Sequence, residues 1–223
     1  PARAWLDDAV LYGVVPRNLG APPGAEAIRR RLGDLADLGV NALWLAPITR
    51  TLDGDYGYAV TDYFDLRSDF GTGDDLCRLV REAHAHGIRV LLDIVPNHTS
   101  SAHRWFRDAE ARGPASPFWS FYARDGAGHP THYFDWAHLP NLDYDQPVVR
   151  RTMADAFARW VRACDVDGYR IDAAWGVRRR RPGFFEELRP LLELLDAGLE
   201  LGRRGTRFMA DALGVSRRQG ERL

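Results

Sequence analysis

The sequence has few of the features that would place it at once in a specialised class. It contains only two cysteines in 223 residues, Cys77 and Cys164, too few for a disulfide-dense secreted scaffold. Both lie in segments with helical patterns, and their spacing does not indicate a metal site. The expected state is two buried free thiols, and a disulfide between them is the alternative.

Long apolar runs and an excess of charge of one sign are also missing. No run could span a bilayer, and a net charge of −1 gives no electrostatic reason to expect a nucleic acid or membrane partner. The run Arg178–Arg181 is local and predicts a solvated loop. No basic start followed by an apolar segment marks a signal peptide. We expect a cytoplasmic location, although removal of a leader stays open because the first residue is Pro1.

What the sequence does have is an alternation of strand-like and helix-like segments. Strands are expected at 9–15, 40–47, 88–95 and 166–172, and a weak fifth strand at 206–210. Helical spacing marks residues 28–38, 74–86 and 184–195, and a helix that starts near Pro147, with Asp145 as its cap. His84 and His86 fall on a helix surface and have no expected role.

This alternation predicts an α/β fold with a parallel sheet. The stretch from Ser100 to Pro140 is too long for an ordinary connection and indicates a functional excursion. Periodicity alone does not separate a closed barrel from an open doubly wound sheet. An open nucleotide-binding sheet would usually carry a glycine-rich turn after its first strand, and "PRNLGAPPGAE" lacks the required glycine spacing.

Polar residues gather where these strands end, which is where parallel α/β folds place functional groups. The third strand ends in "LLDIVPNH", and the fourth ends in "YRID". Arg170 and Asp172 are two residues apart, so both should lie on one face, and the arginine should favour the ionised carboxylate. That pair suits a nucleophile or a cation stabiliser, and a structural ion pair is the alternative. Asp93 is expected to tie loops together.

Several of these strings, taken in order, resemble motifs of the α-amylase family of retaining glycoside hydrolases. They are "YGYAVTDYFDLRSDFGT" at 56–72, "DIVPNH" at 93–98, "LPNLDY" at 139–144 and "GYRIDAAW" at 168–175. The resemblance covers roughly residues 9–188. It implies a (β/α)8 TIM barrel, present here in part, whose loop after the third strand is enlarged into a subdomain at 99–140. It also implies retaining cleavage of α-glucosidic bonds in oligosaccharides.

The resemblance assigns roles residue by residue. Asp172 falls on the nucleophile and Arg170 on the arginine that supports it. Tyr58 and His98 fall on groups that line the sugar subsite, and Asp55 falls on a carboxylate that binds the terminal sugar in exo-acting members. Asn97 falls on a position that ligates calcium in many amylases, although no cofactor is expected to be required.

Two departures bear on catalysis. A retaining glycosidase needs a second carboxyl group, and the nearest match to the family's glutamate is Asp211, a tentative acid position. The family's third carboxylate, preceded by a histidine, has no counterpart before Leu223. We therefore expect an incomplete catalytic domain over 1–223, about five of eight strands, with doubtful activity of its own. A catalytically dead module that binds sugar or a partner, and a transglycosylase, are the alternatives.

Overall fold

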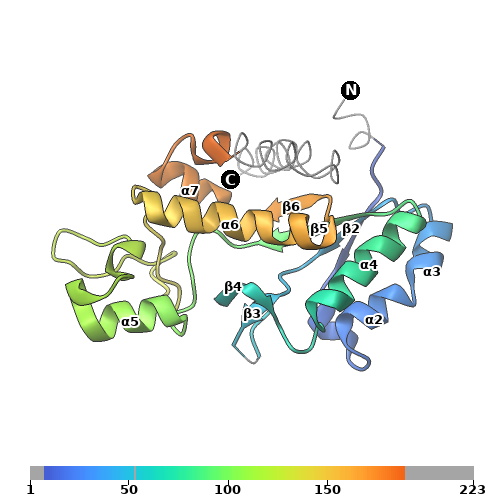
Figure 1. Cartoon of the computed structure of the whole chain (residues 1–223), viewed down its shortest axis with the longest axis horizontal. Coiled ribbons are helices and arrows are strands. Elements are labelled where there is room, and N and C mark those ends of the chain that lie inside the picture. The colour runs from blue at the N-terminus through green and yellow to red at the C-terminus, as the bar shows by residue number, and fades with distance from the viewer. Residues whose placement is uncertain (1–7, 53, 189–223) are drawn as a thin grey trace.

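The computed structural model describes residues 8–52 and 54–188, and its centre is a parallel four-stranded sheet (Figure 1). The strands are β1 (Leu11–Val14), β2 (Ala42–Leu45), β5 (Arg89–Ile94) and β6 (Gly168–Ile171), hydrogen-bonded in the order β1-β2-β5-β6. Each falls inside a strand predicted from the sequence. The expected fifth strand at 206–210 lies outside the described residues.

Helices follow the strands in the expected alternation. They are α2 (Gly24–Arg29), α3 (Leu32–Asp37), α4 (Gly73–Ala85), α6 (Pro147–Cys164) and α7 (Ala174–Arg180), and a short 3₁₀ helix, η1 (Pro16–Leu19), precedes them. The helix expected over 28–38 is therefore two short helices. The N-cap residue of α6 is Gln146, and its side chain makes no capping hydrogen bond. The prediction that Asp145 caps this helix is therefore wrong. Of the helix expected at 184–195, residues 184–188 are helical and the rest lies outside the described residues.

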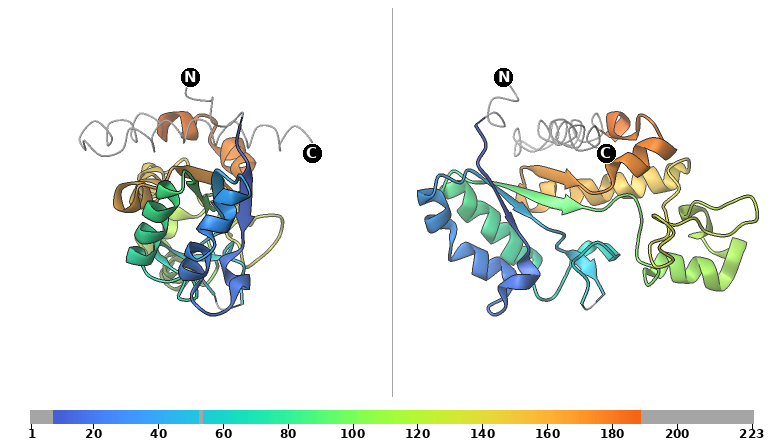
Figure 2. Two further views of the ribbon diagram at one scale, coloured as in Figure 1. Left: turned by 90° about the vertical axis from the view of Figure 1, so that its right-hand side faces the viewer. Right: turned by 180° about the vertical axis from the view of Figure 1, so that it is seen from behind.

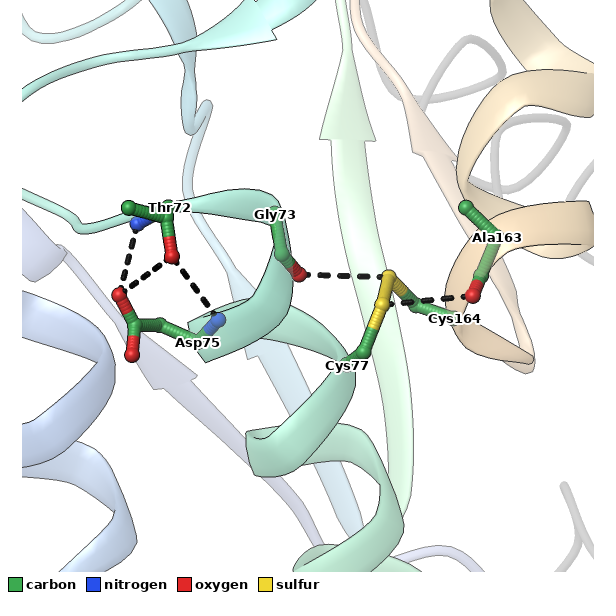
Figure 3. The surroundings of a disulfide bond; sticks show 6 residues. All are labelled: Thr72, Gly73, Asp75, Cys77, Ala163 and Cys164. Atoms are coloured by element: carbon green, nitrogen blue, oxygen red, sulfur yellow. Dashed lines mark hydrogen bonds between the residues drawn. A yellow bond between two sulfur atoms is a disulfide. The ribbon is translucent and has the colours of Figure 1, made fainter.

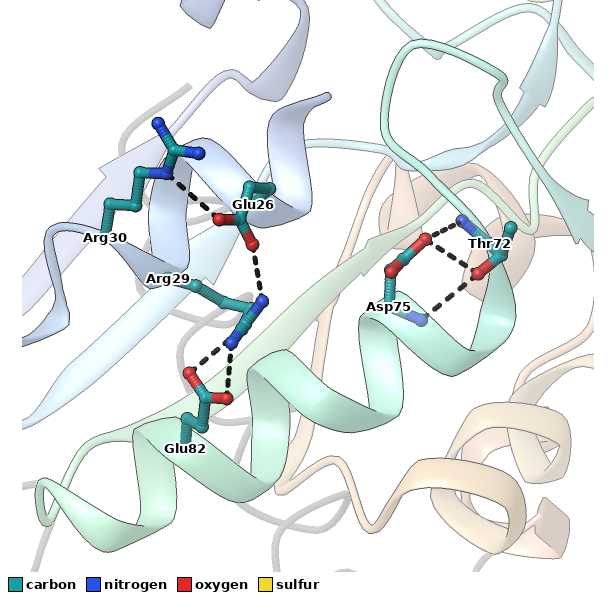
Figure 4. Close-up of polar contacts among 6 residues, drawn as sticks. All are labelled: Glu26, Arg29, Arg30, Thr72, Asp75 and Glu82. Atoms are coloured by element: carbon teal, nitrogen blue, oxygen red, sulfur yellow. Dashed lines mark hydrogen bonds and ion pairs between the residues drawn. The ribbon is translucent and has the colours of Figure 1, made fainter. Parts of the chain in front are cut away.

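Helix α4 shows most directly how the sequence sets a boundary. Thr72 and Asp75 form a reciprocal capping box, in which the Thr72 hydroxyl accepts from the Asp75 amide and the Asp75 carboxylate accepts from the Thr72 amide at 2.9 Å (Figure 4). The face predicted to be apolar is buried: Leu76, Leu79, Val80 and Ala83. The cap fixes where the helix starts, and burial of that face fixes how it sits on the sheet.

An ion-pair group links α2 to α4. The Arg29 guanidinium donates two hydrogen bonds to the Glu82 carboxylate, at 2.9 and 2.6 Å, and also reaches Glu26, which accepts from Arg30 as well (Figure 4). These bonds lower the pKa of Glu82. Helix α2 contacts α4, and α4 contacts α6, so neighbouring helices support one another along the sheet.

The prediction of two free thiols is wrong, because Cys77 and Cys164 form a disulfide (Figure 3). Cys77 lies on α4 and Cys164 is the last residue of α6, and the two Cα atoms are 4.3 Å apart. The cysteines are 87 residues apart in sequence, and only the packing of α4 against α6 brings them together.

His84 is also more than a surface residue of α4. Its Nε2 lies 2.7 Å from Oδ2 of Asp167, a buried carboxylate that also accepts a hydrogen bond from the Val90 amide at 2.8 Å. The pair joins α4 to the start of β5 and to the residue before β6. The sequence placed His84 on the correct helix but gave no sign of a partner 83 residues away.

The segment after β2 contains a hairpin that was expected to be a polar loop. Strand β3 (Thr49–Thr51) pairs antiparallel with β4 (Val60–Leu66), and the turn between them includes residues 54–59. From β4, the buried Tyr63 hydroxyl lies 2.8 Å from the backbone oxygens of both Val95 and His98. The hairpin is therefore held against the segment that follows β5, and its turn is brought to that end of the sheet.

The predicted excursion after β5 projects from the sheet and carries α5 (Arg104–Arg112), as Figures 1 and 2 show. Two 3₁₀ helices follow α5: η2 (Gly113–Ala115) and η3 (Trp119–Phe121). Isolated bridges, including His98 with Asn141 and Tyr122 with Leu142, return the chain toward α6. The excursion has buried aromatic rings of its own, Trp105, Phe106, Phe121 and Tyr122. No helix in residues 8–52 or 54–188 is both long and apolar enough to cross a bilayer.

Candidate active site

Two strand ends bring the predicted charged residues together. Asp93 of β5 and Arg170 of β6 are paired across the parallel ladder, and the Asp172 amide continues that ladder by donating to the Ile94 carbonyl at 2.8 Å. The strand register thus puts Asp93, Arg170 and Asp172 at the same end of the sheet. The expectation that Arg170 and Asp172 share a face is confirmed, since their side chains are hydrogen-bonded.

One guanidinium nitrogen of Arg170 contacts the carboxylates of both Asp93 and Asp172. Arg170 Nη1 lies 2.7 Å from Asp172 Oδ1 and 3.2 and 3.1 Å from the two carboxylate oxygens of Asp93. The Asp93 side chain has no exposed surface, whereas that of Asp172 is 17% exposed. Asp172 is therefore the carboxylate that a ligand can reach. Asp93 holds the Arg170 guanidinium from its buried side.

Asp93 belongs to this site, which corrects its expected role as a tie between loops. Besides Arg170, it accepts a hydrogen bond from Trp44 Nε1 at 3.2 Å and a longer one from the Tyr58 hydroxyl at 3.5 Å. Burial raises the pKa of Asp93 to about 7, against the opposing effect of Arg170. Arg170 is a single cation shared by two carboxylates, so Asp93, the more buried of the two, is the one that burial favours in its protonated form. Trp44, on β2, is a further site residue that the sequence did not indicate.

Tyr58 and His98 lie together beside this cluster. His98 Nε2 is 3.2 Å from the Tyr58 carbonyl oxygen, and its Nδ1 is 3.0 Å from Asn97 Nδ2. A neutral ring with the proton on Nε2 satisfies both contacts. Burial lowers the pKa of His98 to about 4, so the ring is neutral near pH 7. Burial also raises the pKa of the Tyr58 hydroxyl to about 12.

Asp55 organises the hairpin turn that presents Tyr58. Its Oδ1 accepts hydrogen bonds from Thr51 Oγ1 at 2.9 Å and from the amides of Gly57 and Ala59 at 2.7 and 3.0 Å. Burial opposes ionisation of this carboxyl, but these bonds outweigh it and its pKa is lowered. Gly57 has a φ of +107°, and a Cβ there would collide with Pro47, so the turn requires glycine.

The calcium assignment at Asn97 does not fit the surrounding contacts. Arg180 Nη2 donates to the Asn97 side-chain oxygen at 2.7 Å and to its backbone oxygen at 3.0 Å. A guanidinium thus holds both oxygens that a calcium ion would use, and its charge would repel a second cation. Across 8–52 and 54–188, no group of three or more His, Cys, Asp or Glu residues could hold a metal ion.

The prediction that the arginine run forms a solvated loop is also wrong. Residues 178–180 form the last turn of α7, and Arg180 turns inward to Asn97, which is fully buried. A Cβ on Gly176 would collide with Asn97 Oδ1, so glycine at this position of α7 allows the close approach. The tentative acid, Asp211, lies outside the described residues.

A parallel α/β sheet with a reachable carboxylate and its arginine at the carboxyl ends of the strands has the arrangement that α/β-barrel enzymes use for their active sites. The family model described as alpha amylase, catalytic domain, matches residues 24–187. The chain belongs to the α-amylase family of glycoside hydrolases, and its sheet is part of a (β/α)8 barrel.

Curated relatives agree with this assignment. The alpha-amylase MalA of Haloarcula japonica is 37% identical over 190 residues, which cover 84% of this chain and 28% of that protein. The oligo-1,6-glucosidase of Bacillus sp. strain F5 is 28% identical over 206 residues, which cover 78% of this chain and 40% of that protein. The chain therefore spans well under two thirds of the relatives that it matches.

Solved structures show the same fold. The cyclic alpha-maltosyl-(1→6)-maltose hydrolase of Arthrobacter globiformis aligns with a TM-score of 0.74 at 27% identity, over 85% of this chain and 49% of that one. The acarbose-complexed α-amylase of Geobacillus thermoleovorans aligns with a TM-score of 0.66 at 28% identity, over 83% of this chain and 44% of that one.

Proposed function

We propose that this chain forms the glucosyl-binding and nucleophile side of a retaining glycosidase that cleaves α-glucosidic bonds in oligosaccharides. The observation that carries the proposal is the 2.7 Å contact between Arg170 and the partly exposed Asp172 at the end of β6. Membership of the α-amylase family supports it, as does the coincidence of these residues with the motif "GYRIDAAW".

In the proposed reaction, the Asp172 carboxylate attacks the anomeric carbon of a glucosyl unit and the glycosidic C–O bond breaks. The leaving oxygen takes a proton from a second carboxyl group, and water later releases the sugar from the ester, which restores both groups. Arg170 holds the Asp172 carboxylate in position by a hydrogen bond, and Asp93 fixes Arg170. The neutral His98 ring donates from Nε2 to the Tyr58 carbonyl and so fixes the turn, and the Tyr58 hydroxyl donates to a sugar hydroxyl.

The second carboxyl group is the part of the mechanism that the described residues do not supply. Asp93 and Asp172 are the carboxylates within 8–52 and 54–188 that contact Arg170, and Asp93 is fully buried. Asp211 remains the candidate that we propose from the sequence. A sugar- or partner-binding module without catalysis is the second candidate. A transglycosylase would share the covalent intermediate and differ in its acceptor.

The test is covalent trapping, because it separates these candidates. The 223-residue chain is incubated with an activated fluoroglucoside, whose leaving group needs little protonation, and the labelled peptide is identified by mass spectrometry. We expect a glucosyl ester on Asp172, lost in Asp172→Asn and kept in Asp37→Asn, a matched change at an exposed aspartate on α3. Sugar binding without any label would favour the non-catalytic module, and a label on another carboxylate would overturn the assignment of Asp172.

A further inference from the structure

A chain of hydrogen bonds leads from the arginine run of α7 into the proposed active site. Arg180 Nη2 donates to the side-chain oxygen of Asn97 at 2.7 Å, and Asn97 Nδ2 lies 3.0 Å from Nδ1 of the His98 ring. His98 Nε2 lies 3.2 Å from the Tyr58 carbonyl oxygen. We call these four residues the Arg180 relay. Asn97 is fully buried and His98 is 1% exposed, so bulk water does not compete for their contacts.

The guanidinium decides which way the Asn97 amide faces. A guanidinium has only N–H donors, so the amide atom that it contacts at 2.7 Å must be the oxygen. The amide nitrogen is then turned toward His98 Nδ1 and the Asn141 side-chain oxygen, at 3.0 and 3.2 Å. A reversed amide would set its NH₂ group against the guanidinium, with buried donors facing each other, which is costly. Arg180 therefore excludes the reversed orientation.

The orientation of Asn97 in turn fixes where the His98 ring carries its proton. The amide NH₂ group donates, so the Nδ1 atom that faces it has to be the unprotonated acceptor. The other ring nitrogen faces a carbonyl oxygen, which only accepts, so Nε2 carries the proton and donates to Tyr58. Both neighbours of the ring thus select the same tautomer.

The carbonyl at the end of the relay belongs to the residue that presents the Tyr58 hydroxyl. That hydroxyl lies 3.5 Å from Oδ2 of Asp93, the carboxylate that holds Arg170. A His98 ring with its proton on Nδ1 would turn a lone pair toward the Tyr58 carbonyl and lose this hydrogen bond. The tautomer of His98 therefore bears on the position of Tyr58.

We propose that Arg180 is a positioning residue that sets the tautomer of His98 through the Asn97 amide and so holds Tyr58 in place to meet a sugar. Arg180 lies on the last turn of α7 and contacts Asn97, so its effect reaches the site through other residues. The hydrogen-bond relay is a property of the folded chain, whereas its use in catalysis rests on the proposed function.

The experiment observes the tautomer directly. Heteronuclear NMR of the nitrogen-labelled 223-residue chain at neutral pH reports whether each ring nitrogen carries a proton. In the wild-type chain we expect only the tautomer of His98 with its proton on Nε2. Arg180→Met frees the Asn97 amide to turn over, so a second population with the proton on Nδ1 should appear. Arg180→Lys supplies only donors at the same position and should restore the wild-type tautomer.

Asn97→Asp is a second variant, which keeps a partner for the guanidinium and so covers the case that Arg180→Met does not fold. A carboxylate has no N–H to donate, so the Nδ1 atom of His98 has to carry a proton to meet it. The His98 Nδ1 resonance should therefore move to the position of a protonated ring nitrogen.

Two controls accompany these variants. Arg179→Met removes an exposed arginine from the same helix and should leave the His98 tautomer unchanged. The buried His103 is an internal reference, because its Nδ1 accepts a hydrogen bond from the Trp105 amide at 3.1 Å, outside the relay. The tautomer of His103 should be the same in every variant.

The role in positioning is tested by labelling the same variants with the activated fluoroglucoside. Displacement of Tyr58 should slow the labelling of Asp172 in Arg180→Met by up to about a hundredfold, with recovery in Arg180→Lys. An unchanged His98 tautomer in Arg180→Met and Asn97→Asp would overturn the relay and leave the proposed function standing. A changed tautomer with an unchanged labelling rate would overturn the positioning role. Absence of labelling in the wild-type chain would count against the proposed function and not against the relay, which NMR tests without turnover.

Discussion

At the scale of single residues, the site depends on one arginine that contacts two carboxylates, of which one is fully buried and the other is partly exposed. Arg170 contacts Asp93, which is fully buried, and Asp172, which a ligand can reach. Trp44 and Tyr58 donate to Asp93 from other elements, so the arginine is aimed by a carboxylate that is itself held. Positioning of this kind matters, because a misplacement near 1 Å can cost about a hundredfold in rate.

Arg180 is the residue whose replacement we expect to be most informative for stability. Arg180→Met leaves the side-chain oxygen of the buried Asn97 without its guanidinium donor, whereas the backbone oxygen keeps the Leu142 amide at 3.1 Å, and an unpaired buried acceptor is costly. We expect a loss of about 2 kcal/mol in the free energy of unfolding, measured by urea denaturation. Arg179→Met, at the exposed neighbouring position on α7, should cost little.

The same residue gives a test for calcium. Because Arg180 already holds the oxygens of Asn97, saturating calcium should not raise the melting temperature of the wild-type chain, and a chelator should not lower it. A clear calcium-dependent rise in the wild-type chain, lost in Asn97→Ala, would contradict this account of Asn97 and restore the sequence-based assignment.

At the scale of elements, two helices far apart in sequence are locked together. The disulfide joins α4 to the end of α6, and the cap at Thr72 and Asp75 starts α4 only a few residues before Cys77 (Figure 3). Because α6 leads into β6, this connection helps fix the strand that carries Arg170.

Removal of the disulfide should therefore destabilise the fold. For Cys77→Ser/Cys164→Ser we expect a loss of about 2–4 kcal/mol in the free energy of unfolding, because the cross-link restricts the unfolded chain. A reductant should lower the urea midpoint of the wild-type chain and leave that of the double variant unchanged. Titration of two free thiols in the unreduced native chain would contradict the bond.

At the scale of the whole molecule, the site is assembled from parts that no short stretch of sequence contains. Strands β5 and β6 supply the charges, and the β3–β4 hairpin supplies Tyr58. The excursion after β5 supplies Tyr133, whose ring centroid lies 4.8 Å from that of His98. The hairpin and the excursion are attached to the carboxyl end of the sheet.

This arrangement predicts a gradient of backbone protection. Strand β5 is paired on both sides and is buried from Val90 to Ile94, whereas three of the four residues of β1 are exposed. In native-state hydrogen exchange followed by mass spectrometry, peptides from β5 should exchange slowest and those from β1 fastest among the four strands. Equal protection of β1 and β5 would contradict the strand order.

The sequence alone determined the strands of the sheet, the apolar face of α4 and the order of the family's motifs. Local periodicity and capping residues carry that information, so these features can be predicted without knowledge of the fold. The spacing of Arg170 and Asp172 also determined their shared face, since side chains alternate along a strand. The hairpin at β3 and β4 was missed because its short first strand lies in a polar stretch.

Only the tertiary structure decided which distant residues meet. Asp93 and Arg170 are 77 residues apart and meet across the ladder of β5 and β6. Cys77 meets Cys164 through the packing of two helices, and Arg180 donates to the oxygens of Asn97. Each of these contacts depends on register and packing, which local periodicity does not record. The contacts of a side chain depend on such long-range packing, which is why the sequence predicted that Arg170 and Asp172 share a face but misjudged Asp93.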